Sequence, residues 1–139
     1  MIRSMPLQTI TGSSWTTLRT LSAAVADSSG LPTAGTLTDL PTVSGNGGLP
    51  RLVELYIDNA GATPTLGGSP TSLIVRIYRE VDSKVSLIYT WVVSATDATN
   101  SDVTPIIIET YGNKLYPKVS FSGGASPTVT ATVRARCLE

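Results

Sequence analysis

The stretch TSLIVRIYREVDSKVSLIYTWVVS, residues 71–94, holds the densest alternating apolar pattern in the chain and decides the fold. Side chains alternate across a β-strand, so residues two apart share a face. The odd positions within 73–81 and 85–93 are mostly apolar, and Asp82-Ser83-Lys84 separates the two runs. The stretch therefore predicts a hairpin of two long strands with one buried face.

Facing residues of a hairpin must share a face, and this requirement sets the expected register. A two-residue turn at Asp82-Ser83 would place odd positions opposite even ones and mix the core face with the polar face. An odd-length turn pairs Val75 with Trp91, so we expect a turn of three or five residues. The same register pairs Val81 with Val85 and Ile77 with Tyr89.

The opposite face of this hairpin is also partly apolar. The expected register places Ile74 opposite Val92 and Tyr78 opposite Ile88. A face washed by solvent is normally polar. We therefore expect either the N-terminal part of the chain or another subunit to cover it.

Four further segments are expected to be strands, three from alternation and one, at 104–110, from the run Ile106, Ile107 and Ile108. Strands are expected at 51–58 and at 104–110, where Pro105 indicates an edge strand or an entry point. A final hairpin is expected between 115–121 and 129–137, joined through Gly123-Gly124 and Pro127. The positions expected to point away from the core include Glu54, Tyr56, Thr128, Thr130, Thr132, Arg134 and Arg136.

These strands predict an all-β fold, an antiparallel β-sandwich of jelly-roll-like or Ig-like type, over residues 51–139. Residues 1–50 are interpreted as an extended N-terminal arm and irregular loop. Within them, residues 15–25 fit either a short helix or a strand, and the alternation of Leu21, Ala23 and Val25 favours the strand.

The first 50 residues carry only four charges and are rich in glycine and proline after residue 26. Ordering each backbone residue costs roughly 1–2 kcal/mol, more than a few buried leucines return. We therefore expect this segment to contact a partner surface or to stay mobile. The candidate interface residues are Leu31, Leu37, Leu40, Val43, Ile74, Tyr78, Ile88 and Val92.

Composition limits the classes of partner. The 10 basic and 10 acidic residues cancel, so the sequence predicts neither nucleic-acid nor membrane binding. The sequence shows no apolar span and no signal peptide. With one cysteine, no intramolecular disulfide forms, and we expect synthesis in a reducing cytoplasm.

No catalytic or cofactor motif is evident, so we expect no enzymatic activity and no cofactor. Histidine is absent, which removes Ser-His-Asp and Cys-His chemistry and most zinc sites. Cys137 is interpreted as a buried apolar residue. Asp97, Asn100 and Asp102 offer oxygen ligands for Ca²⁺, but ordinary turn residues are the preferred interpretation, and no metal is expected.

Two other groups of side chains are candidates for carbohydrate chemistry. Carboxylate pairs for glycoside cleavage would come from Glu54, Glu80 and Glu109, but nothing in the sequence places two across a cleft. A sugar-binding face would come from Tyr56, Tyr78 and Tyr116, although exposed tyrosines more often pack at interfaces.

The Gly/Ser/Thr-rich segment through Pro50, the hairpin from Leu73 to Val93 and the closing segment from Lys114 to Arg136 together resemble the accessory β-sandwich proteins of tailed-phage virions, the capsid decoration or cement class. This resemblance rests on general character over the whole chain and on no specific motif. It implies a non-enzymatic virion protein, made in the host cytoplasm, that binds the major capsid protein or another virion protein. It also implies a homo-oligomer, with a trimer favoured.

A carbohydrate- or receptor-binding module of a phage head or tail is the alternative function. A small hydrolase on a β scaffold is a third class, which the absence of histidine makes the weakest.

Overall fold

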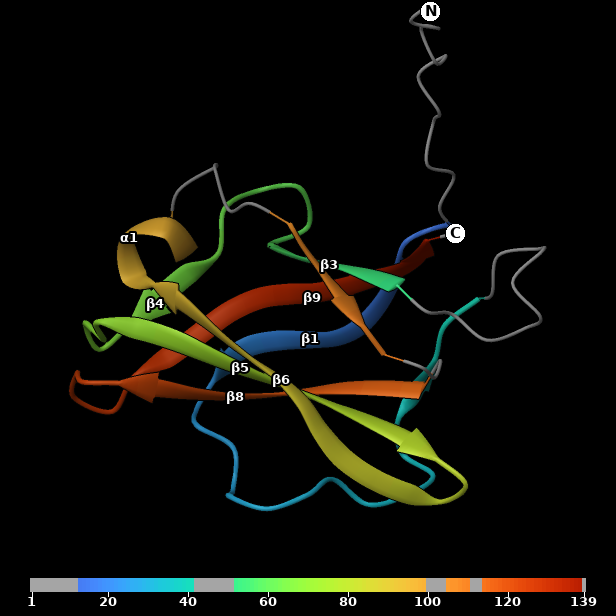
Figure 1. Ribbon diagram of the computed structural model, residues 1–139. Helices are drawn as coiled ribbons and strands as arrows, with labels where there is room; N and C mark the ends of the chain where they lie inside the picture. Colours follow the sequence, from blue (N-terminus) through green and yellow to red (C-terminus); the bar gives the residue numbers. More distant parts are fainter. Residues whose placement is uncertain (1–12, 42–51, 100–104, 111–113, 139) are drawn as a thin grey trace, which may run out of the picture.

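Two antiparallel sheets pack face to face in the computed structural model, which describes residues 13–41, 52–99, 105–110 and 114–138. Figure 1 shows the two layers and the path of the chain between them. The expected antiparallel β-sandwich is therefore confirmed. The first sheet has the order β1 (Thr16–Ala24), β9 (Thr128–Leu138), β3 (Leu52–Asp58) and β7 (Ile106–Glu109), with β4 (Thr65–Gly67) also paired to β9. The second sheet has the order β2 (Thr38–Asp39), β8 (Lys114–Ser122), β5 (Ser72–Val81) and β6 (Lys84–Ser94), and one helical turn, α1 (Ala95–Ala98), follows β6.

The segment at 15–25 is a strand, and the helical alternative is wrong. Strand β1 pairs with β9 from Thr16 opposite Ala135 to Ala24 opposite Val129. Strand β2 pairs with the start of β8. The sandwich thus includes residues N-terminal to position 51, while the expected arm at 1–12 and the loop at 42–51 lie outside the described residues.

Alternating apolar residues from both sheets form the core between the layers. Leu55 and Ile57 of β3 face Leu73, Val75 and Ile77 of β5 across this core, and all five side chains are buried. Burying each such side chain contributes about 1.5–3 kcal/mol. Strand β7 lies at the edge of the first sheet, directly after Pro105, as the sequence predicted.

The central hairpin has the predicted core register but a different turn. Val75 pairs with Trp91 and Ile77 with Tyr89, as expected. The turn, however, has only two residues, because Val81 pairs with Lys84. The prediction of a three- or five-residue turn is therefore wrong, as is the pairing of Val81 with Val85.

A β-bulge at Ile88 reconciles the short turn with the core register. Ile77 pairs with Tyr89, but the next residue, Tyr78, pairs with Leu87, so Ile88 is the extra residue. The expected pairing of Tyr78 with Ile88 is wrong, while Ile74 pairs with Val92 as expected. The bulge moves Val85 and Leu87 from the expected core face to the opposite face, beside Glu80 and Tyr78.

The expected final hairpin does not form, because β8 and β9 belong to different sheets. Their alternation was interpreted correctly, since Leu115 and Val119 of β8 and Val129 and Val133 of β9 are buried. The two strands contribute to the same core from opposite sheets instead of lying side by side. Alternation identifies the buried face of a strand, but it does not identify the sheet that the strand joins.

Two glycines allow the β8–β9 connection to pack on the β4–β5 connection. The N–H of Ala125 donates to the carbonyl oxygen of Gly68 at 2.9 Å. A Cβ on Gly68 would lie 2.4 Å from the Ala125 oxygen, and one on Gly124 would lie 2.7 Å from the Gly68 oxygen. Both glycines also have positive φ, so no other residue fits either position without strain.

Asp27 joins the first sheet to the second. Arg19 of β1 donates from Nη1 to Asp27 Oδ2 at 2.6 Å and from Nη2 to Oδ1 at 2.8 Å. The N–H of Val119 in β8 donates to Oδ2 at 2.6 Å, and the Asp27 N–H donates to the Val119 oxygen at 2.9 Å. Asp27 thereby occupies part of the edge of β8 that the short strand β2 leaves open.

The segment from 25 to 37 runs over the outer face of the second sheet, along its lower side in Figure 1. Beyond Asp27, the N–H of Gly35 donates to Glu80 Oε1 at 2.5 Å, and Lys118 Nζ donates to the Ser28 oxygen at 3.1 Å. Tyr78 beneath it is only 6% exposed. The chain's own N-terminal part thus covers this face over β5 and β8, while Val92 of β6 stays 60% exposed.

The turn geometry predicts a stabilising substitution. Asp82 and Ser83 both have positive φ (51° and 62°), the pattern of a type I′ turn, which favours glycine at the second position. Ser83→Gly should raise the free energy of unfolding by about 0.5–1 kcal/mol, since the left-handed conformation costs a non-glycine residue about 1 kcal/mol. Urea titration measures the change. Ser86→Gly, within β6, should instead destabilise by about 0.5–1 kcal/mol, and equal effects of the two changes would contradict the turn assignment.

The surroundings of Asp27 predict a loss of stability in acid. Burial alone would raise the pKa of Asp27, but the hydrogen bonds from Arg19 and the Val119 N–H outweigh it and hold the pKa below its ordinary value. A carboxyl whose pKa is lowered on folding stabilises the protein above its unfolded pKa, about 3.9, and this contribution is lost as the pH falls through the folded pKa.

Asp27→Asn should therefore lower the free energy of unfolding at pH 7 by about 1–3 kcal/mol. The difference from the parent protein should shrink below about pH 4. Urea titrations between pH 7 and pH 2 measure both, and Asp39→Asn is the control for removing one carboxylate. A difference that stays constant across this range would contradict the role given to Asp27.

Candidate functional site

The structure separates the candidate interface residues into buried and exposed groups. Leu37, Leu40 and Tyr78 are buried inside the chain, so they are not accessible to a partner in this structure. Leu31 and Val92 are each 60% exposed. Ile74 and Ile88 are half-buried, and Val43 lies outside the described residues. An interface role for the exposed members stays a prediction.

Strand β6 forms an exposed edge with apolar side chains. It is the last strand of the second sheet, and within the described residues nothing pairs with its free edge. Leu87, Tyr89 and Val92 are 46%, 39% and 60% exposed. Lys84 is the only charged residue among its 11 positions. We call this edge and its three exposed apolar side chains the β6 surface.

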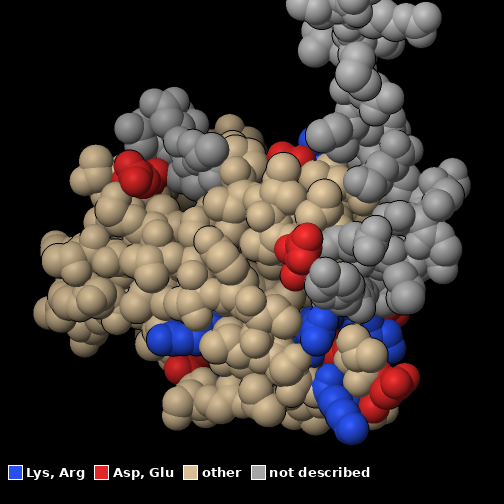
Figure 2. Space-filling view, viewed as in Figure 1, with Lys and Arg blue, Asp and Glu red and all other residues tan. Residues whose placement is uncertain are grey.

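Figure 2, viewed as Figure 1, shows that the middle of the face where β6 lies is uncharged, while charged side chains gather near the β5–β6 turn. Natural sheets commonly protect an exposed edge with charges, proline or a covering segment, because its free N–H and C=O groups pair readily with another strand. Beyond Lys84, β6 has neither charge nor proline. The edge is thus chemically suited to binding another chain.

A second candidate site lies on the outer face of the first sheet. The rings of Trp15, just before β1, and Tyr56 of β3 lie 6.0 Å apart between centroids at an interplanar angle of 51°. The guanidinium carbon of Arg136 lies 4.7 Å from the centroid of Trp15. We call this group, with Glu54, Asp58 and Arg134, the Trp15 cluster.

Two ion pairs hold the arginines of the Trp15 cluster in place. Arg136 donates from Nε and Nη2 to Glu54 Oε2 at 3.0 and 2.8 Å. Arg134 donates from Nε to Asp58 Oδ1 at 3.1 Å, and its Nη2 also contacts Asp58. Each arginine charge is therefore offset by a carboxylate, and the cluster as a whole is neutral.

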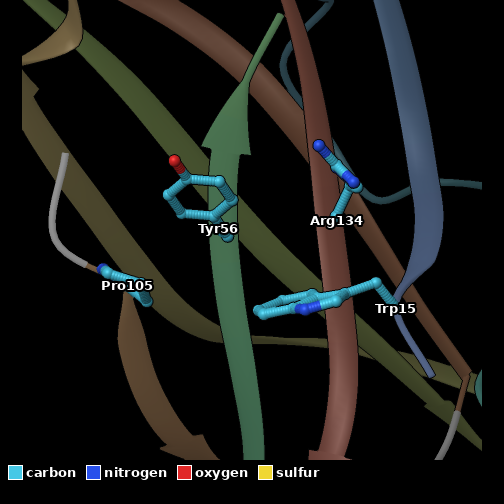
Figure 3. A pocket seen from close by; sticks show the side chains of 4 residues that line it. All are labelled: Trp15, Tyr56, Pro105 and Arg134. Atoms are coloured by element: carbon cyan, nitrogen blue, oxygen red, sulfur yellow. The ribbon is translucent and has the colours of Figure 1, made fainter. Parts of the chain in front are cut away.

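A shallow cleft of about 350 Å³ opens beside Trp15, lined by Trp15, Tyr56, Pro105 and Arg134. Figure 3 shows Tyr56 and Arg134 on the same side of the Trp15 ring, with Pro105 across from Arg134. The volume is near the lower end of the range for ligand pockets, roughly 300–1,000 Å³. The cleft is large enough to hold one small ring with an apolar face.

The three tyrosines proposed as a sugar-binding face do not share a face. Tyr56 lies on the outer face of the first sheet. Tyr78 and Tyr116 are paired on the second sheet, where Tyr78 is buried. The sequence analysis missed Trp15, although it placed Tyr56, Glu54 and both arginines on outward faces. The pairing of β3 with β9, if known, would have shown that Tyr56, Glu54 and the two arginines are neighbours.

The carboxylates considered for glycoside cleavage also lie apart. Glu54 belongs to the Trp15 cluster on the first sheet, while Glu80 lies on the second sheet and contacts Gly35 and Lys114. Glu109 lies on β7 at the edge of the first sheet. Cys137 is fully buried, and burial raises the pKa of its thiol, which keeps it protonated and unreactive.

The part of the chain that the structure describes contains no group of three side chains able to hold a metal ion. Asp97 lies on α1, while Asn100 and Asp102 are outside the described residues. Among the described residues, no helix is long and apolar enough to cross a membrane. No protein-family model, curated protein or solved structure matches this chain.

Proposed function

We propose that this protein is a structural subunit of a tailed-phage virion, a decoration or cement protein that binds the capsid surface through the β6 surface and stabilises the shell. The observation that carries the proposal is a long, almost uncharged, open strand edge with exposed apolar side chains. The resemblance in sequence character to virion accessory proteins supports the virion as the setting. The proposal includes no catalytic activity.

Pairing of strand edges would give the contact between β6 and another subunit both affinity and a defined orientation. A strand added to β6 would satisfy the free N–H and C=O groups of the edge. Leu87, Tyr89 and Val92 are about half exposed, so covering each would add about 1 kcal/mol. The partner would be an edge strand or an extended segment of a neighbouring virion subunit.

The symmetry of the assembly distinguishes two uses of this edge. Antiparallel pairing of β6 with β6 of a second copy is self-complementary and gives a two-fold dimer. A three-fold ring joins unlike patches, so pairing of β6 with β6 cannot form the favoured trimer. We therefore keep the trimer as the proposed state and assign β6 to the capsid contact, which leaves this edge open in the free protein.

A charge placed on β6 should prevent binding to the capsid. Val92→Lys adds a cation at a 60% exposed position, so it should change stability by less than about 0.5 kcal/mol. A lysine on an edge strand opposes pairing with another strand. We expect Val92→Lys to weaken binding to phage capsids at least tenfold, as measured by co-sedimentation, and to leave the oligomeric state measured by light scattering unchanged.

Ile107→Lys is the matched control, since Ile107 is 55% exposed on β7, the edge strand of the other sheet. It should leave capsid binding as in the parent protein. If Val92→Lys binds capsids normally, or if both variants lose capsid binding equally, the β6 surface is not the contact.

The Trp15 cluster favours a second candidate function, the binding of a neutral sugar in a carbohydrate- or receptor-binding role. An exposed indole beside a second ring offers an apolar platform, and the paired arginines and carboxylates offer hydrogen-bond donors and acceptors for hydroxyl groups. The neutral charge of the cluster is suited to an uncharged ligand. Nucleic acid would instead require cations without counter-charges.

Binding of a neutral hexose or its oligomers should shift the indole N–H signal of Trp15 in nitrogen-correlated NMR spectra. The only other tryptophan, Trp91, is 7% exposed in the core, and its signal should stay in place. Trp15→Ala should weaken binding by about tenfold, a typical loss for one stacked ring, while Tyr89→Ala, an exposed aromatic on the other sheet, should not. Unchanged signals with neutral sugars would exclude this function.

A further inference from the structure

A hollow of about 390 Å³ lies on the outer face of the second sheet, under residues 27–30 of the covering segment. Its floor comes from β5 and β8, through Arg76, Tyr78, Lys118 and Ser120. Serines 28 and 29 line the opposite side. The hollow is separate from both the β6 surface and the Trp15 cluster.

Two cations stand side by side in this hollow. Arg76 of β5 pairs directly with Lys118 of β8 in the strand register. Like charges at directly opposite positions destabilise a sheet. Arg76 Nη1 donates to Ser120 Oγ at 2.7 Å and Lys118 Nζ to the Ser28 oxygen at 3.1 Å, both uncharged acceptors. Within the described residues, neither cation forms an ion pair.

One carboxylate lies beside these cations. Asp27 also lines the hollow and attracts Lys118, but its oxygens accept hydrogen bonds from Arg19 and from the Val119 N–H, so a single negative charge faces three cations. Tyr78 adds a donor, because it is 6% exposed and its hydroxyl has no hydrogen-bond partner among the described residues. A buried tyrosine hydroxyl usually has one. The cations Arg19, Arg76 and Lys118 thus outnumber the one carboxylate beside this space, and hydroxyl donors line it as well.

We propose that this hollow binds an oxyanion of the phosphate type, either inorganic phosphate or a phosphomonoester group. A dianion with three or four oxygens can accept hydrogen bonds from Arg76, Lys118 and several hydroxyls together. A carboxylate has one charge and two oxygens, so it would leave part of the donor set unused. The bound anion would remove the repulsion between Arg76 and Lys118 and would hold residues 27–30 against the sheet.

The test is a titration of the full chain with inorganic phosphate, followed by thermal unfolding, with sodium chloride keeping the ionic strength constant. Phosphate should raise the melting temperature in a saturable way, since a ligand that binds the folded state stabilises it. Glycerol phosphate distinguishes the two sources. If it raises the melting temperature more than inorganic phosphate does, the ligand is a phosphomonoester. If it raises the melting temperature less, the ligand is inorganic phosphate. Acetate should have little effect, and an equal effect of acetate would overturn the phosphate-type assignment.

Arg76→Gln separates binding from folding. Without phosphate this variant should be as stable as the parent or more stable, because it removes a like-charge pair and glutamine can still contact Ser120. With phosphate its apparent affinity should fall about tenfold or more. Tyr78→Phe should reduce the affinity severalfold without lowering stability.

Lys84→Gln is the matched control, because it removes one cation at the β5–β6 turn, outside the hollow. It should bind phosphate as the parent does. A phosphate effect that is the same in Arg76→Gln as in the parent, or that sodium chloride alone reproduces, would overturn the proposal.

Discussion

The two-residue turn at Asp82-Ser83 is the constraint that sets the register of the central hairpin and the outward position of Leu87. Such a turn pairs Val81 with Lys84 and would place the odd positions of β5 opposite the even positions of β6. Core packing nevertheless requires Val75 opposite Trp91, so one extra residue, Ile88, is accommodated in a bulge. The side chains between the bulge and the turn then change face. Leu87 moves from the expected core face to the outside, where it lies on the same face of the hairpin as Val92.

The sequence predicted the buried faces better than it predicted the partners of each strand. Alternation identified the core residues of β3, β5, β8 and β9, because each of these strands has one face against the other sheet. It did not show that β8 and β9 join different sheets, since a glycine-rich connection such as 123–127 suits a hairpin and a crossover equally. The contact of Gly68 with the Ala125 backbone, which holds this crossover, depends on two loops far apart in sequence.

The N-terminal part of the chain shows why apolar content alone was an incomplete guide. Leu37 and Leu40 are buried, but the covering segment is also held by polar contacts that no periodic pattern reveals. Asp27 binds Arg19 and Val119, and Gly35 binds Glu80. The sequence pattern also did not predict the Trp15 cluster or the hollow beside Arg76 and Lys118. Trp15 meets Tyr56, and Arg76 meets Lys118, only because particular strands are neighbours.

The central claim is that β6 binds another subunit through its free edge. Hydrogen exchange, followed peptide by peptide in the free protein and in capsid-bound protein, tests it directly, because edge pairing protects backbone amides that are open in the free chain. The account predicts that residues 84–94 gain the largest protection on binding and that β7, the edge of the other sheet, gains little. Protection confined to β7 or to the Trp15 cluster, with β6 exchanging as fast as in the free protein, would contradict it.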